Sequence, residues 1–242
     1  FDSYTDSILS AFTHNPNSEE VVNKKTKIVS GVYEFYNHVP ESVLFVGFNP
    51  VILSSNAKEI WVTEISEWGK TELTKHNVKF KYIEYSDLYK LNKNFDAVVA
   101  LDEYFTFAES DQEQQQQIKL FCNLTRGFVI STLRDYKNQD YKDREYSQPV
   151  LLRSGTEKIT YIESHDWDFK DRSSWKTTVY EIDQTKNSLA NYGPFSRRTM
   201  YFKQLANFSA VAGADAFLVH KNLMYKGLVK KNYEHVITIK FE

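Results

Sequence analysis

Short apolar segments alternate with amphipathic segments through the first half of the chain, and this alternation restricts the fold more than any other feature. The apolar segments have the length of strands, at 43–47, 60–65, 78–85, 97–102 and 127–133. The amphipathic segments have helical spacing, at 50–57, 66–76 and 111–125. Strands that alternate with helices form a parallel sheet with helices on both faces. The sequence therefore predicts an α/β fold.

The flanking segments extend this pattern. An amphipathic helix is expected from about residue 17 to residue 39, where Pro40 stops it ahead of the first strand. After the insertion described below, residues 201–213 have helical spacing and end at a glycine, and strands are expected at 215–220 and 235–241. The connection 221–234 would then join two antiparallel strands at the end of the chain.

Composition excludes several classes of function. With 30 basic and 32 acidic residues and a net charge of -2, the chain is not suited to neutralise a phosphate backbone, so nucleic acid is not expected as a partner. Cys122 is the only cysteine, which rules out an internal disulfide and a cysteine-based zinc site and fits a reducing, cytoplasmic setting. No apolar run approaches the roughly 20 residues of a membrane span, so no membrane association is expected.

Polar residues stand where two of the predicted strands end. The apolar run Val43–Val46 ends in Gly47, and Glu64 closes the next strand. Open α/β sheets bind adenosine-bearing cofactors at the carboxyl ends of their strands, with a glycine turn after one strand and a carboxylate at the end of the next. Glycine lets the backbone approach a ligand closely, and a carboxylate can accept hydrogen bonds from two ribose hydroxyls at once. This edge of the sheet is therefore the expected site.

The order of these elements resembles the class I S-adenosylmethionine-dependent methyltransferase superfamily, over roughly residues 21–137 and 197–242. The resemblance implies a Rossmann-like fold with a mostly parallel seven-stranded sheet, whose final strand returns antiparallel between its neighbours. It also implies that S-adenosylmethionine is the cofactor. The residues that it assigns to cofactor binding are Gly47, Phe48 and Asn49 beside the amino acid portion, Glu64 at the ribose, Ser86 and Asp87 at the adenine, and Leu101 at the end of the fourth strand.

The first motif is degenerate by the standards of that superfamily. Its members usually have an acidic residue in the first strand and two or three glycines in the turn, whereas this chain has Phe45 and the single Gly47. Only sixteen residues separate Gly47 from Glu64, so the first crossover has room for a short helix only. Asn49 offers a side-chain amide in place of the missing glycines, and Pro50 suits the first position of a helix.

Under this resemblance one domain covers residues 1–242. It consists of an N-terminal helical segment (1–40), a cofactor-binding half (41–137), an antiparallel β-rich insertion or lid (138–200), and a C-terminal helix with two strands (201–242). The insertion is indicated by interleaved aromatic, serine and charged residues, with short alternating runs at 157–163 and 176–183. Lids of this kind cover the pocket in methyltransferases that act on small molecules.

The candidate catalytic residues are Asp102 and Tyr104, directly after the fourth strand, and His165 in the insertion. Methyl transfer is an in-line displacement that needs alignment, exclusion of water and sometimes a base. His165 has a suitable pKa for a base, or else it is a surface-loop histidine without a catalytic role. Its neighbours Asp166 and Asp168 are too few to form a metal site, so no metal is expected. The pair Arg197 and Arg198 either binds an acidic group or lies on an exposed approach to the next helix.

The sequence thus predicts a methyltransferase that transfers a methyl group to a small or medium-sized acceptor. The segment Leu101–Phe105 lacks the prolines of enzymes that methylate amino groups of DNA bases. The chain has 16 tyrosines, and a protein partner could bind the tyrosine-rich insertion. The tyrosines near or inside it are Tyr136, Tyr141, Tyr146, Tyr161 and Tyr180.

Two alternatives stay open on the sequence alone. One is a methyltransferase-like protein that has lost catalysis and serves in binding or assembly, which the single glycine supports. The other is a nicotinamide-dependent oxidoreductase, because Glu64 would equally suit an adenosine ribose. That class normally carries a Gly-x-Gly-x-x-Gly turn, which the chain lacks.

Overall fold

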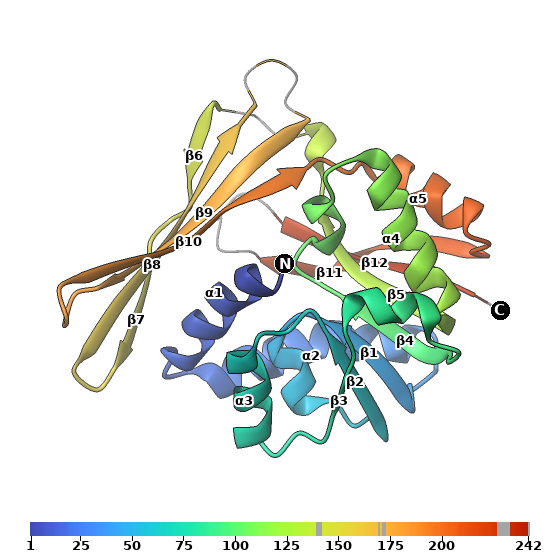
Figure 1. Ribbon diagram of the computed structural model, residues 1–242, viewed down its shortest axis with the longest axis horizontal. Helices are drawn as coiled ribbons and strands as arrows, with labels where there is room; N and C mark the ends of the chain where they lie inside the picture. Colours follow the sequence, from blue (N-terminus) through green and yellow to red (C-terminus); the bar gives the residue numbers. More distant parts are fainter. Residues whose placement is uncertain (139–141, 169, 171–172, 227–232, 242) are drawn as a thin grey trace.

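The computed structural model describes residues 1–138, 142–168, 170, 173–226 and 233–241 of the chain. Within these residues, seven strands form one sheet in the order β11-β12-β5-β4-β1-β2-β3 (Figure 1). The strands are β1 (Ser42–Val46), β2 (Glu59–Thr63), β3 (Lys81–Tyr82), β4 (Phe95–Ala100), β5 (Thr125–Arg134), β11 (Ala216–Lys226) and β12 (Tyr233–Lys240). Tyr141 and residues 227–232 of the expected final connection lie outside the described residues.

The strand directions confirm the expected ending of the sheet. β1 pairs in parallel with β2 and β4, β4 with β5, and β2 with β3. The last strand, β12, lies between β5 and β11 and is antiparallel to both. The predicted α/β fold, mostly parallel with one antiparallel final strand, is therefore confirmed.

Helices cover both faces of this sheet because successive side chains of a strand point to opposite faces. Val43 and Phe45 of β1 pack in one apolar cluster with Val29 and Val32 of α2. Leu44 and its neighbours on the other face pack in a second cluster with residues of α4 and α5. The helices are α1 (Asp2–Thr13), α2 (Ser18–Phe35), α3 (Glu67–Lys75), α4 (Asp111–Asn123) and α5 (Phe202–Val211).

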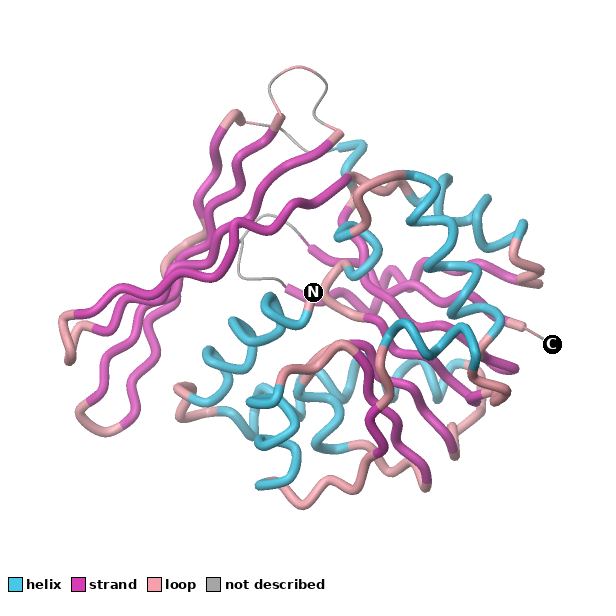
Figure 2. Tube along the Cα trace, in the orientation of Figure 1, coloured by secondary structure: helices cyan, strands magenta, loops and turns pink. Residues whose placement is uncertain are grey.

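The insertion forms a second, antiparallel sheet that stands beside the first (Figure 2). Its described strands are β6 (Arg144–Tyr146), β7 (Val150–Ser154), β8 (Glu157–Trp167), β9 (Ser174–Asp183) and β10 (Ser188–Arg198). They are ordered β10-β9-β8-β6, with β7 also paired to β8. Helix α1 lies between the two sheets, so it can contact both of them (Figure 1).

Three details differ from the sequence-based prediction. The third strand, expected over 78–85, is only the two-residue β3 and is followed by the 3-10 helix η2 (Tyr85–Lys90). The first crossover contains the 3-10 helix η1 (Pro50–Ser54), which Asn49 caps by accepting a hydrogen bond from the Val51 amide at 3.1 Å. Helix α1 was not predicted as a separate helix. No helix in the described part of the chain has the length and apolar character needed to cross a membrane.

Candidate functional site

The carboxyl ends of β1 and β2 bring Gly47 and Glu64 together, as the sequence predicted. Val46 is in register with Thr63, and the Gly47 amide donates a hydrogen bond to the Thr63 carbonyl at 2.8 Å. The neighbouring strand β4 ends at the same edge and is followed by Leu101 and Asp102. This edge therefore holds a glycine turn, a carboxylate from the second strand and a carboxylate from the fourth.

Backbone strain is concentrated at these strand ends. Gly47 has a φ of 73°, and the non-glycine residues Glu64, Asp102 and Glu103 have φ values of 50°, 57° and 57°. The left-handed region costs a residue with a side chain about 1–3 kcal/mol, and such strain clusters at binding and catalytic sites. The conformation directs three acidic side chains from the ends of β2 and β4 into positions that regular strand geometry would not reach.

Glu64 is a half-buried residue whose carboxylate has one buried oxygen with spare hydrogen-bonding capacity. Burial raises its pKa, and a hydrogen bond from Tyr104 acts in the opposite direction. Its Oε2 atom is buried and makes no hydrogen bond within the described part of the chain, and the same holds for the Thr63 hydroxyl. Leaving a buried acceptor unsatisfied costs about 1–3 kcal/mol. A ligand hydroxyl at this position would supply the missing donor.

The other residues expected to bind the cofactor have different surroundings. Phe48 and Leu101 are buried in the apolar core, while Asn49 caps η1 and donates from Nδ2 to Asp102 Oδ2 at 3.0 Å. Ser86 and Asp87 lie exposed in η2 instead of ending a strand, and Asp87 pairs with Lys90 at 3.0 Å.

Two tyrosines approach Glu64. Tyr104 is 2% exposed, and this burial raises the pKa of its hydroxyl. The nearby Glu64 carboxylate and Tyr85 raise that pKa further. Tyr85 in turn lies within the electrostatic influence of Glu64 and Tyr104. The sequence had assigned Tyr104 to catalysis, and the structure places it beside the Glu64 carboxylate. Tyr85 was missed, because nothing in the sequence distinguishes it from its neighbours in the expected strand.

The first turn of α1 covers the glycine turn. A Cβ atom built on Gly47 would lie 2.6 Å from Phe1 Cε1 and 2.6 Å from Thr5 Cγ2, a distance that real Cβ atoms do not tolerate. The Phe1 ring also packs edge-on against Tyr104 and Phe107, with centroids 4.8 and 4.7 Å apart. Side chains of α1 therefore fill the space directly in front of Gly47.

A cavity of about 200 Å³ adjoins this region on the side of the insertion. Its walls come from α1, from the start of α2, from the ends of β4 and β5, and from β7, β8 and β9. The charged residues that line it are Lys25, Asp102, Arg134 and Glu163. Asp102, one of the predicted catalytic residues, thus lines a partly open cavity that is large enough for part of a small molecule.

Behind the cavity lies a network of buried charges. Glu103 is 1% exposed and contacts Arg134 at 2.7 Å, the Tyr136 hydroxyl at 2.5 Å and Arg197 at 3.6 Å. The Arg197 guanidinium also stacks on Phe107, 3.9 Å from the ring centroid. Arg197 is therefore buried and has a structural role. The expectation that it lies on an exposed approach to the next helix is wrong for this residue. Its neighbour Arg198 pairs with Asp111 at 2.8 Å.

His165 is not a surface-loop residue. It lies on β8, is 3% exposed, and places Nδ1 3.0 Å from Thr177 Oγ1 and Nε2 3.5 Å from Glu163 Oε2. Burial raises the pKa of Glu163, but the neighbouring His165, with Arg134 and Arg197, brings it below its ordinary value. Glu163 lines the cavity, and His165 contacts it from behind. His165 can thus orient the Glu163 carboxylate.

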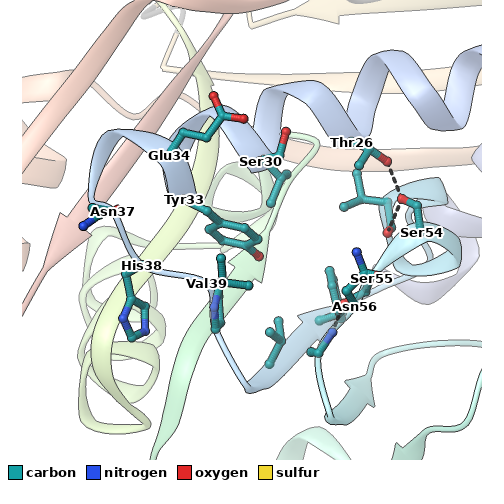
Figure 3. Close-up of a pocket in the computed structure, with 16 residues that line it drawn as sticks. Thr26, Ser30, Tyr33, Glu34, Asn37, His38, Val39, Ser54, Ser55 and Asn56 are labelled. Carbon is teal, nitrogen blue, oxygen red and sulfur yellow. Dashed lines mark hydrogen bonds between the residues drawn. The ribbon is translucent and has the colours of Figure 1, made fainter.

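A second cavity of about 350 Å³ lies between α2 and the first crossover, where the short η1 replaces a full helix (Figure 3). Thr26 of α2 hydrogen-bonds Ser54 across it, and Tyr33 extends from α2 toward it (Figure 3). None of Gly47, Glu64 and Asp102 lines this cavity. It is therefore separate from the strand-end site.

Metal ligands do not gather in the part of the chain that the structure describes: no group of three or more His, Cys, Asp or Glu side chains there could hold a metal ion. The strand-end site is thus built from carboxylates, hydroxyls and aromatic rings.

The chain resembles known proteins in structure but not detectably in sequence. No protein-family model matches the sequence, and no curated protein matches it significantly. A solved S-adenosylmethionine-dependent methyltransferase from Clostridium acetobutylicum is 11% identical, with a TM-score of 0.66 over 90% of this chain and 91% of its own. The CcbJ methyltransferase from Streptomyces caelestis is 12% identical, with a TM-score of 0.63 over 91% and 90% of the two chains.

A third solved structure is that of CalS10, an amino pentose methyltransferase from Micromonospora echinaspora with bound S-adenosylmethionine. It is 10% identical, with a TM-score of 0.59 over 93% of this chain and 91% of its own. These likenesses span 90–93% of this chain. They show that the chain has the class I S-adenosylmethionine-dependent methyltransferase fold.

Proposed function

We propose that the protein is a methyltransferase that uses S-adenosylmethionine and acts on a small or medium-sized acceptor. The observation that carries this proposal is Glu64, a carboxylate at the end of β2 whose buried Oε2 lacks a hydrogen-bond partner among the described residues. It lies beside the left-handed Gly47 turn, in a fold that the compared methyltransferases share. The antiparallel β12 between β5 and β11 favours this function over a nicotinamide-dependent oxidoreductase.

The residues at the strand ends suit the chemical groups of this cofactor. Glu64 can accept hydrogen bonds from the ribose hydroxyls, and Tyr104 and Tyr85 offer rings and hydroxyls beside it. Gly47 has no side chain of its own that would keep its backbone from the amino acid portion once Phe1 and Thr5 are displaced. When bound, the cofactor supplies a methyl group activated by its sulfonium charge.

The cavity beside Asp102 is the proposed acceptor site. Its carboxylates, Asp102 and Glu163, can orient the acceptor atom and take the proton that this atom loses as it gains the methyl group. The Asn49 side chain holds Asp102 and connects it to the turn after β1. Helix α1 and the insertion form much of the cavity wall, which limits the access of water to the reacting atoms. His165 acts on Glu163 and is assigned a positioning role.

Calorimetric titration with S-adenosylhomocysteine tests the proposal. We expect the wild type to bind, and Glu64→Ala to bind about 10- to 150-fold more weakly, which corresponds to the 1.5–3 kcal/mol of hydrogen bonds to a charged group. Glu67→Ala is a matched control, because this exposed glutamate lies three residues away in the first turn of α3. Absence of binding at millimolar ligand would contradict the enzyme proposal.

That same outcome would favour the second candidate, a methyltransferase-like protein that serves in binding or assembly. The specific observation in favour of it is the contact of Phe1 and Thr5 with the glycine turn, which fills the space that the amino acid portion of a cofactor would take. The single glycine of the first motif agrees with it. Binding of the wild type with loss of affinity in Glu64→Ala would exclude this candidate.

A further inference from the structure

We propose that helix α1 is a gate that covers the cofactor site, is fastened to the insertion by a cluster of hydrogen bonds, and swings away to admit the cofactor. The proposal rests on the proposed function, because the ligand that the gate admits is S-adenosylmethionine. It assigns a role to the N-terminal helix and to one group of tyrosines in the insertion. Three sets of contacts carry it.

The first set closes the site. Thr5 is 1% exposed, and its methyl group and the Phe1 ring meet Gly47 so closely that a single added carbon atom would clash with both. A cofactor is far larger than a methyl group. The face of Gly47 is thus inaccessible to it as long as the first turn of α1 keeps this position, and binding against this turn requires α1 to move.

The second set fastens the other end of α1 to the insertion. The Ser10 hydroxyl lies 2.9 Å from the Tyr161 hydroxyl and donates to Glu181 Oε2 at 2.5 Å. Tyr161 and Tyr192 donate to the same carboxylate oxygen at 3.2 and 3.1 Å, and His14 Nδ1 lies 3.1 Å from the Tyr161 hydroxyl. We call these five residues the clasp. They join one helix to three strands through polar contacts that water can replace.

The third set fastens α1 to the start of helix α3. The Ser66 hydroxyl, which also caps α3, donates to the Asp6 carboxylate. The buried face of α1 is itself half polar, since Thr5, Ser7 and Ser10 are buried beside Tyr4, Leu9 and Phe12. Separation of such a face exposes less apolar surface than separation of an ordinary amphipathic helix. Segments held in this way open locally at a free energy below that of global unfolding.

The gate also forms a wall of the acceptor cavity. Tyr4, Ser7, Ile8, Ala11 and Phe12 of α1 line that cavity, while Phe1 and Thr5 cover Gly47. One rigid helix therefore contributes to both sites. The acceptor cavity is complete only with α1 in place, so the cofactor must bind before the acceptor.

Thiol labelling detects the movement without any ligand. Thr5→Cys places a thiol at the closed contact, and the natural Cys122, 3% exposed in the core, reports global unfolding in the same molecule. We expect the introduced thiol to be modified at least tenfold faster than Cys122 under native conditions. Equal rates for the two thiols would overturn the gate.

Variants of the clasp test what holds α1. Tyr161→Phe in the Thr5→Cys background removes the hydroxyl that contacts Ser10, His14 and Glu181, and we expect it to speed labelling of the introduced thiol about tenfold without a matching change at Cys122. Tyr146→Phe is the control, because Tyr146 is 60% exposed on β6, away from the clasp. An unchanged labelling rate in Tyr161→Phe would show that the clasp does not hold the gate.

A reversible crosslink ties the movement to binding. The side chains of Asp6 and Ser66 are in contact, so Asp6→Cys with Ser66→Cys can form a disulfide that locks α1 shut. We expect the oxidised variant to bind S-adenosylhomocysteine at least tenfold more weakly than the same protein after reduction. Equal affinity in both states would overturn the gate. Failure of the wild type to bind would instead refute the proposed function, and the labelling rates would still decide whether α1 opens.

Discussion

The Glu103 carboxylate lies 2.7 Å from the Arg134 guanidinium, at the point where the ends of β4 and β5 meet the insertion. Both side chains are at most 10% exposed, and Arg197 of β10 reaches the same carboxylate at 3.6 Å. Three segments that are distant in sequence are thus joined through one acidic residue. This junction sets the position of the insertion over the strand ends.

Substitution of Glu103 should therefore lower the urea concentration at which the protein unfolds. Glu103→Gln removes the negative charge that contacts two buried guanidinium groups, and we expect a loss of about 3–5 kcal/mol in the free energy of unfolding measured with urea. The control is Glu41→Gln, which breaks an exposed pair with Lys58 at 2.6 Å and should cost less than about 1 kcal/mol. Similar losses in the two variants would contradict the role of Glu103 as a junction.

Gly47 should be far less tolerant of alanine than another glycine of similar backbone conformation. Both Gly47→Ala and Gly155→Ala place a side chain in left-handed backbone, at φ values of 73° and 60°, which costs about 1–2 kcal/mol. Only at Gly47 does the added carbon meet Phe1 and Thr5, whereas nothing lies within 4 Å at Gly155. We expect Gly47→Ala to lose about 1–3 kcal/mol more than Gly155→Ala in denaturant unfolding. Equal losses would show that α1 does not press on the turn.

Glu64 should lower stability at neutral pH. Burial raises its pKa, with the hydrogen bond from Tyr104 acting against this. A carboxyl group with a raised pKa stabilises the folded state below its ordinary pKa, and this contribution is lost as the pH rises through the folded value. Glu64→Gln should thus be more stable than the wild type at pH 7, and the difference should shrink toward pH 4. A variant less stable than the wild type at pH 7 would contradict this sign.

Glu163 should show the opposite dependence. Burial raises its pKa, but His165, Arg134 and Arg197 lower it further than burial raises it. A carboxyl group with a lowered pKa stabilises the folded state above its ordinary pKa, and this contribution is lost as the pH falls through the folded value. We expect Glu163→Gln to melt below the wild type at pH 7 and the two melting temperatures to converge in acid. Equal melting temperatures of the variant and the wild type at neutral pH would instead show that His165 does not lower the pKa of Glu163.

The fold could be predicted from the sequence because its main strands are continuous apolar segments. The segments around Val43, Ala97 and Phe128 became β1, β4 and β5, and the two C-terminal segments became the antiparallel pair β11 and β12. The third strand was overestimated because residues 78–85 alternate as a strand should, although only Lys81 and Tyr82 pair with β2. Periodicity reports which residues favour a strand and does not report where a neighbouring strand ends.

The site was predicted in part. Gly47, Glu64 and Asp102 follow strands directly, so their place at one edge of the sheet follows from topology. Helix α1 lies within the expected N-terminal helical segment 1–40 but was not predicted as a separate helix, because polar Thr5, Ser7 and Ser10 interrupt its buried face. The environment of His165 and Arg197 depends on how the insertion docks, which is a set of contacts between residues far apart in sequence. No local pattern carries that information.

A crystal structure of the full chain with S-adenosylhomocysteine tests the central claim most directly. We expect the ligand between Gly47 and Glu64, with its ribose hydroxyls about 3 Å from the Glu64 carboxylate and the first turn of α1 displaced from Gly47. A ligand bound at another place, with Phe1 and Thr5 still against Gly47 and Glu64 Oε2 still without a partner, would contradict the account.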